Sequence, residues 1–361
     1  MRAVLLLLGA LAVPLTLIWD FAWESTIGVD SFFGPPHAAN YAAVALACAA
    51  ALRMAQLATR EGSGIALGPV RAPLGAWLAL WGGLALIAAL AFDRWWQASY
   101  GLAAGIWHPP QIAKALAYFA LVAGAWVYAL GRQHDTRGEL AAALACGALL
   151  ALIAVVTLPQ SFANRQHSGA FYLLTCSVYP LVLAAQAVAG RLRLPATAAA
   201  LAYLALCAAA VWILPLIPGS PQAGPVYNTR DHLLPPPFPL LLVVPALAVD
   251  ALLNVLPGRA RRGERWMQAL EAGLAFAALF IVAQWLFALF LLSPAADGRL
   301  FAGGGRHWPF FLRIDPSART AFWDQLAPEL GLLSGALAAA LAVASARAGL
   351  WLGAGLRAVQ R

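Results

Sequence analysis

Long apolar runs separated by short polar breaks dominate this sequence. Each run has roughly 20 residues, enough for an α-helix to cross a hydrocarbon core of about 30 Å. The runs are rich in Ala and Leu and lack the alternating polarity that membrane β-strands need. We therefore predict an all-α, polytopic transmembrane bundle of about ten helices. The predicted spans are 3–19, 37–57, 74–92, 111–131, 139–158, 169–190, 196–215, 238–256, 268–292 and 328–350.

The composition also indicates a chain embedded in lipid. Of the 361 residues, 62% are hydrophobic and only 11% are charged, which is too little polar surface for a water-soluble globule. We treat residues 1–361 as a single integral membrane domain. No small-x-small cleavage site follows the first apolar run, so we expect this run to remain as a helix. The four cysteines lie inside predicted spans without CxxC spacing, which predicts neither disulfides nor a thiolate metal site.

Arginines are distributed unevenly between the two sets of connecting loops. One set and the C-terminus carry thirteen arginines, whereas the opposite short loops carry only Arg94, Arg165 and Arg230. By the positive-inside rule, the arginine-rich loops and both termini are cytoplasmic, and the other loops face the periplasm. Because 22 of the 23 basic residues are arginine, we expect a GC-rich bacterial genome and hence a bacterial inner membrane.

The formal net charge of +8 comes largely from these inner loops and forms no continuous basic stripe. Nucleic acid is therefore excluded as a partner. The expected partners are the lipid bilayer and other membrane subunits.

An internal repeat covers the first four predicted helices, with residues 9–57 resembling residues 82–131. At an offset of 73, Asp20 aligns with Asp93, Glu24 with Gln97 and Gly28 with Gly101, and after a one-residue slip Pro35-Pro36-His37 aligns with Pro109-Pro110-Gln111. Each copy reads as helix, outer loop, Pro-Pro and helix. The sequence thus predicts a duplicated helix-loop-helix unit in the N-terminal half.

The two copies differ at residues that can bind metals or transfer protons. These are Glu24, Asp30 and His37 in the first copy and Gln97, Ala103 and Gln111 in the second. Pro-Pro suits the first turn of a helix, so His37 is expected at a helix N-terminus. There the positive end of the helix dipole disfavours imidazolium and keeps a lone pair available for a metal. Glu24 and Asp30 are expected to supply oxygen ligands from the loop.

Other polar residues of the outer loops extend this candidate site. Three histidines are candidate metal ligands from neighbouring loops, namely His108, His167 and His232. Further outer-face candidates are Asp20, Asp93, Gln97, Gln111, Lys114 and Asp231. Lys114 lies one turn inside its helix and is expected to pair with Asp93 or another outer acid. The alternative interpretation is that these polar groups cap helices and brace loops.

Two classes of function fit these features. The first, which we favour, is a membrane protein with a copper, zinc or iron site on its outer face for redox chemistry or metal handling. The second is a non-catalytic permease or a scaffold subunit of a membrane complex, since repeats are common in transporters. Neither class identifies catalytic residues or an organic cofactor. The long outer loop 293–327 is a candidate lid or docking surface over the site.

Overall fold

The structure is a computed structural model that describes residues 2–28, 31–101, 108–220, 222, 231–255, 265–296, 298, 300–301 and 329–359. These ranges contain ten α-helices, nine of which are long and apolar enough to cross a membrane. The chain is therefore a multi-pass membrane protein, and the predicted all-α class is confirmed. The helices are α1 (Arg2–Ile27), α2 (Pro35–Glu61), α3 (Leu74–Tyr100), α4 (Pro109–Leu130), α5 (Thr136–Val156), α6 (Gly169–Ala189), α7 (Pro195–Ile213), α8 (Val243–Asp250), α9 (Arg265–Leu292) and α11 (Leu332–Val359).

The eighth predicted span, 238–256, is wrong in its extent. Its helical part is only α8 followed by a π-helical turn, η4 (Ala251–Val255), and residues 233–241 are not helical. Prolines at positions 235–237 and 239 have no amide hydrogen to donate and fix their own φ angles, which opposes helix formation. An extended chain therefore replaces the first part of the expected helix.

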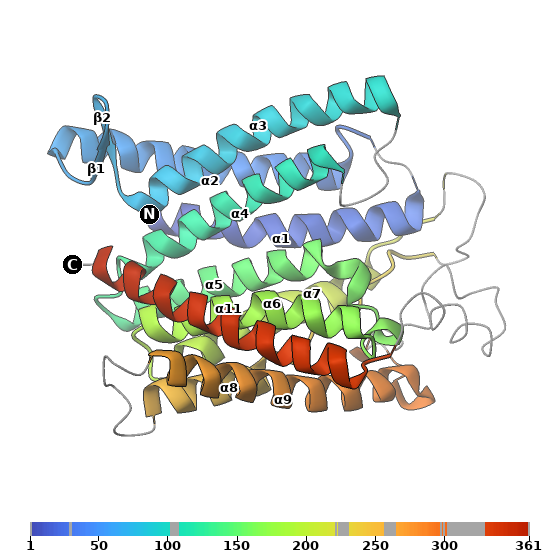
Figure 1. Cartoon of the computed structure of the whole chain (residues 1–361). Coiled ribbons are helices and arrows are strands. Elements are labelled where there is room, and N and C mark those ends of the chain that lie inside the picture. The colour runs from blue at the N-terminus through green and yellow to red at the C-terminus, as the bar shows by residue number, and fades with distance from the viewer. Residues whose placement is uncertain are drawn as a thin grey trace.

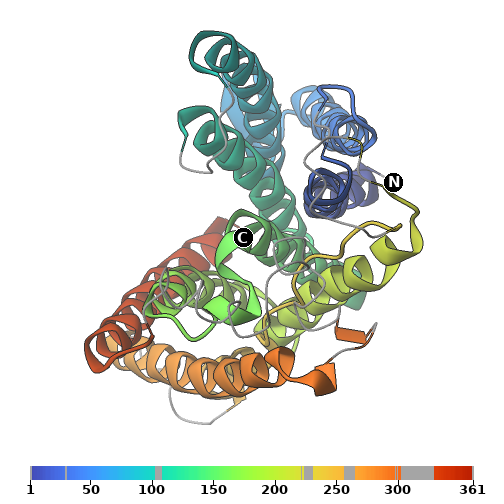
Figure 2. The ribbon, with the colours of Figure 1, turned by 90° about the vertical axis from the view of Figure 1, so that its right-hand side faces the viewer.

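The helices form two groups, which Figure 2 shows end-on. In the first group α1 pairs with α2 and α3 pairs with α4, and in the second α11 packs against α6 and α9. Contacts of α5 with α1 and α4 join the groups. The start of α1 and the end of α11 lie at the same end of the bundle (Figure 1). An antiparallel hairpin of β1 (Ile65–Leu67) and β2 (Val70–Ala72) lies at that end too.

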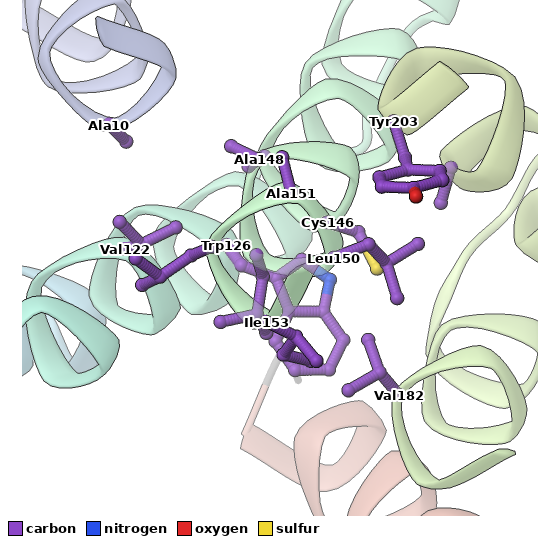
Figure 3. Close-up of a cluster of buried hydrophobic side chains, with 14 of the residues drawn as sticks. Ala10, Val122, Trp126, Cys146, Ala148, Leu150, Ala151, Ile153, Val182 and Tyr203 are labelled. Carbon is purple, nitrogen blue, oxygen red and sulfur yellow. The ribbon is translucent and has the colours of Figure 1, made fainter. Parts of the chain in front are cut away.

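A buried tryptophan links the two groups of helices. Trp126 of α4 lies close to Leu150 of α5 and Val182 of α6 (Figure 3). Its indole N–H donates to Gln186 Oε1 at 2.7 Å, and both residues are buried. Buried Trp needs such a partner for its single polar atom. Helix α4 is thereby fixed to α6 by packing and by a hydrogen bond.

Two glycines allow the paired helices of the first group to approach closely. A Cβ atom on Gly9 would collide with Ala47 of α2, and one on Gly82 would collide with Leu121 of α4. Leu121 follows Ala47 by 74 residues, the same offset that relates the two Pro-Pro pairs. Small residues at helix crossings are common in membranes. The two hairpins thus cross at corresponding positions, which favours the predicted duplication of residues 9–57 and 82–131 without testing its origin.

The non-helical segment 233–241 is largely buried, so its backbone amides need partners inside the protein. Three of these amides donate to side-chain oxygens of α1, α7 and α9. The pairs are Leu234 with Thr26 Oγ1 at 2.8 Å, Leu240 with the Tyr203 hydroxyl oxygen at 2.9 Å and Leu241 with Gln284 Oε1 at 2.9 Å. Gln284 also donates to Gln166 Oε1 at 2.7 Å. A network of side chains therefore replaces the helical hydrogen bonds that this segment lacks.

Asp250 likewise supplies side-chain acceptors for the backbone amides in the first turn of α7. Its carboxylate accepts hydrogen bonds from the amides of Ala196 and Thr197 at 3.2 and 2.7 Å and from the Thr197 hydroxyl at 2.8 Å. Asn254 donates to it at 3.1 Å. The first amides of a helix have no partners within the helix and attract negative charge. Asp250 is fully buried and so serves as a cap supplied by a neighbouring helix.

The Thr26 hydroxyl provides a test of this network. We expect Thr26→Val to lower the free energy of unfolding by about 1–3 kcal/mol, because the buried amide of Leu234 loses its acceptor. Thr175→Val is the matched control, since Thr175 is equally buried and its hydroxyl donates only to carbonyls of its own helix. Denaturant unfolding in detergent measures both, and equal losses would contradict the role given to Thr26.

Candidate metal centre

Three side chains with metal-binding chemistry meet where α1 ends and α2 begins. Asp20 and Glu24 come from α1, and His37 comes from the first turn of α2. One donor atom from each residue lies within 4.8 Å of the others. Asp20 and His37 are half-buried and Glu24 is exposed. In the part of the chain that the structure describes, no other group of three such residues is found.

The length of α1 decides which residues can join this group. The helix continues to Ile27, well beyond the predicted end at residue 19, so Glu24 is presented by a helix and not by a loop as expected. Residues four apart lie on the same helical face, which places Asp20 and Glu24 one turn from each other. Asp30, the third ligand expected from the sequence, lies outside the described residues.

The start of α2 fixes the position of His37. Pro35 and Pro36 occupy the first turn of the helix after the N-cap residue Gly34, as predicted. The loop before them turns tightly, with the amide of Gly34 donating to the carbonyl of Ser31 at 2.8 Å. The same carbonyl lies 2.8 Å from His37 Nδ1. The loop therefore holds the imidazole ring in one orientation.

The hydrogen bonding of His37 determines what its other nitrogen can do. A carbonyl oxygen only accepts hydrogen bonds, so Nδ1 must carry the proton and donate to Ser31. In a neutral ring Nε2 then presents a lone pair, and it lies 3.2 Å from Asp20 Oδ2, which also bears lone pairs. These two atoms attract each other only if a positive charge is shared, either a proton on Nε2 or a metal ion bound by both. A histidine whose Nδ1–H is held by a carbonyl is the usual arrangement of a metal ligand.

Buried hydrogen bonds connect the helices one turn away from these three side chains. Asn40, one turn after His37, donates to Thr16 Oγ1 at 2.9 Å, and Thr16 lies one turn before Asp20. The hydroxyl of Tyr118 from α4 donates to Asn40 Oδ1 at 2.6 Å. Asn40 is 2% exposed. These hydrogen bonds join α1 and α2, which carry the donor atoms, to each other and to α4, and so limit the movement of the donor atoms.

The corresponding part of the second hairpin carries an ion pair. Lys114 Nζ lies 2.8 Å from Asp93 Oδ2, which confirms the predicted pairing of these residues. Gln97 donates to the same oxygen at 3.1 Å. Gln111 occupies the first turn of α4, as His37 does in α2. The second hairpin thus compensates its carboxylate with a lysine.

The three other candidate histidines are not part of the group formed by Asp20, Glu24 and His37. His108 is the N-cap residue of α4 and lies edge-on to the Trp96 ring. His167 Nε2 lies 3.2 Å from the carbonyl of Trp285. His232 Nδ1 lies 2.9 Å from Asp231 Oδ1. In these places each ring contacts neighbours other than Asp20, Glu24 and His37.

Asp20 is the residue that sequence reasoning undervalued. The sequence places it on the outer face without a ligand role, because the first predicted span ends at residue 19 and leaves Asp20 and Glu24 in a loop. The spacing of four between Asp20 and Glu24 is the signal that identifies them as neighbours, once α1 is known to extend past both. The loop 293–327 lies mostly outside the described residues, so its predicted role as a lid remains a prediction.

The donor set fits a transition metal ion. One imidazole nitrogen and two carboxylate oxygens suit zinc or iron(II), and three protein ligands leave coordination positions for water or a substrate. The four cysteines are not in this group, and three of them are fully buried in helices. No protein-family model, curated protein or solved structure matches this chain. The chemistry of these residues is therefore the basis for assigning a function.

The ion pair of the second hairpin can be tested by a double-mutant cycle. Lys114→Met leaves the Asp93 carboxylate, whose side chain is only 10% exposed, without its cation, and should cost about 3–5 kcal/mol of stability. Adding Asp93→Asn removes the uncompensated charge and should recover most of that loss. Unfolding in detergent of the wild type, the two single variants Lys114→Met and Asp93→Asn, and the double variant provides the measurement. A double variant no more stable than Lys114→Met would show that the pair does not balance charge.

Proposed function

We propose that this multi-pass membrane protein binds one divalent transition metal ion through Asp20, Glu24 and His37. The observation that carries the proposal is the contact of His37 Nε2 with Asp20 Oδ2 at 3.2 Å while Nδ1 is held by the carbonyl of Ser31. A bound cation turns this contact between two acceptors into shared coordination. The bound ion would serve redox chemistry or the handling of the metal itself.

The carboxylate of Glu24 favours a metal ion over a proton as the positive charge shared by His37 and Asp20. A protonated His37 carries one positive charge, and Asp20 and Glu24 together carry two negative charges when ionised. Like charges four residues apart on a helix repel each other. A divalent ion within reach of all three donor atoms supplies twice the positive charge of a single proton.

The type of ligand narrows the choice of metal. Carboxylate and imidazole donors suit zinc and iron(II), whereas copper(I) prefers thiolates and thioethers. Met54 and Met267, the two methionines that the structure describes, are not in the group, and neither is any cysteine. Of the metals expected from the sequence, we therefore place zinc and iron ahead of copper in its reduced state, copper(I).

We place the metal site on the periplasmic side of a bacterial inner membrane, with both termini in the cytoplasm. The excess of arginines in the loops at one end supports this orientation. The start of α1 and the end of α11 lie at that arginine-rich end of the bundle, and the end of α1 and the start of α2 lie at the other (Figure 1). An outer site would meet metal ions or substrates without their crossing the membrane.

A permease is the second candidate function, and the broken element before α8 favours it. Transporters often bind their substrates where a helix is interrupted within the membrane. Here the segment 233–241 precedes a helix of eight residues, and part of it lines a small hollow together with Ile18, Tyr203 and Cys207. The hydrogen bonds that fix the segment are equally suited to a static scaffold, the other alternative. A carrier should exchange solute across vesicles, which a scaffold subunit should not.

Metal content provides the direct test of the proposed site. We expect the purified, detergent-solubilised protein to hold close to one zinc or iron ion per chain, and His37→Ala to hold almost none because a ligand is lost. His108→Ala is the control, since this histidine of the outer loops lies outside the group. Elemental analysis after matched reconstitution measures all three. Equal metal content in the wild type and the folded His37→Ala variant would overturn the proposal.

Orientation can be tested with single cysteines in a variant that lacks the four native ones. Ser31→Cys and Ser63→Cys are matched, because both serines are exposed and lie at opposite ends of α2. A membrane-impermeant maleimide should label position 31 in intact spheroplasts and position 63 only after permeabilisation. The reverse pattern would place the metal site in the cytoplasm.

A further inference from the structure

We propose that the second hairpin holds an internally occupied counterpart of the metal site, in which the ammonium group of Lys114 takes the place of the metal ion. This inference rests on the proposed function of the first hairpin. It assigns to Lys114 the role of a tethered cation and to the protein a capacity for one metal ion at these sites, not two. It also identifies the residues that decide which hairpin binds a free ion.

The correspondence between the hairpins extends to the residue that supplies the charge. The offset of 74 that relates His37 to Gln111 also relates Asn40 to Lys114. In the first hairpin this position carries an uncharged amide that donates to Thr16. In the second it carries an ammonium group that reaches Asp93 Oδ2 at 2.8 Å. The two hairpins thus differ at this position, where the second carries an internal cation and the first an uncharged amide.

The other differences between the hairpins follow from this one. With Lys114 in place, Asp93 already has a compensating charge, and a second carboxylate would leave the group negative. Gln97 replaces Glu24 at that position and donates to Asp93 Oδ2 at 3.1 Å. A metal-binding imidazole is likewise not required, and Gln111 stands where the first hairpin has His37. The residues at positions 97, 111 and 114 are therefore consistent with one another, since each suits a group that already contains a cation.

The second carboxylate retains coordinating capacity. Asp93 is only 7% exposed, and its Oδ1 atom is buried without a hydrogen-bond partner. Buried carboxylate oxygens are normally paired, so an unpaired one is costly. Lys114 and Gln97 both contact Oδ2 and leave Oδ1 available. An ion that replaced the ammonium group could use this oxygen, with side chains at positions 97 and 111 completing the site.

The first experiment introduces the tethered cation into the metal-binding hairpin. In Asn40→Lys the new ammonium group should reach Asp20, and the variant should lose its metal ion. Asn40→Met is the matched control, because it removes the same hydrogen bonds to Thr16 and Tyr118 and has a similar length without the charge. We expect Asn40→Met, which loses these hydrogen bonds but adds no charge, to bind the ion more weakly than the wild type and at least tenfold more tightly than Asn40→Lys. Elemental analysis and metal titration of both folded variants measure the difference.

The second experiment moves the metal site to the other hairpin. In a His37→Ala background, which should bind no metal, the substitutions Gln97→Glu and Gln111→His recreate the ligands of the first hairpin. Lys114→Asn recreates the uncharged amide of Asn40. The combined variant should bind one ion, whereas the same variant with Lys114 retained should bind none. Zinc titration with folding monitored by circular dichroism provides the measurement.

The outcomes separate this inference from the proposed function. If the wild type binds one ion and Asn40→Lys binds it equally well, the tethered-cation role of Lys114 is wrong and the first site stands. If the combined variant binds no ion although it is folded, the second hairpin is not a counterpart of the site. A wild type that binds no metal would overturn the proposed function and this inference with it.

Discussion

The pairing of every polar group inside an apolar layer is the constraint on which this structure depends. Helices meet it automatically, since their amides are bonded within the chain. Where the chain is not helical, at residues 233–241, oxygens of Thr26, Tyr203 and Gln284 supply the missing acceptors from three different helices. Asp250 meets the same need at the buried start of α7. These polar contacts determine how the second group of helices packs around an irregular segment and against α1.

Charged groups inside an apolar layer need partners even more than neutral polar groups do, because they are more costly to bury. The two N-terminal hairpins meet this need differently. A carboxylate near the edge of a membrane must be paired or hydrated. Asp93 is paired with Lys114 inside the protein. Among the residues that the structure describes, Asp20 instead lies beside Glu24 and a histidine whose Nδ1 is already engaged. In our proposal, a divalent ion is what completes the outer end of the first hairpin.

Hydropathy was sufficient to predict the nine long helices and the all-α class, because only helices can carry such apolar runs across lipid. It failed at 238–256, where prolines and three side-chain acceptors favour an extended backbone over a helix. Comparison of the two repeat copies singled out Glu24 and His37, and the position of Lys114 one turn inside its helix predicted its pairing with an outer acid such as Asp93. Asp20 was recognised as an outer residue only, since its role depends on α1 continuing to Ile27. His167 contacts the carbonyl of Trp285, 118 residues away, and such a contact between distant helices is not encoded locally in the sequence.

The most direct test of the central claim is the K-edge X-ray absorption spectrum of the metal bound to the purified protein. We predict a first shell of nitrogen and oxygen at about 2.0–2.2 Å, with the outer scattering of one imidazole ring, as His37 and two carboxylates would give. The imidazole scattering should disappear in any metal retained by His37→Ala. A sulfur scatterer at about 2.3 Å, or a spectrum unchanged by that substitution, would place the metal elsewhere and contradict the site.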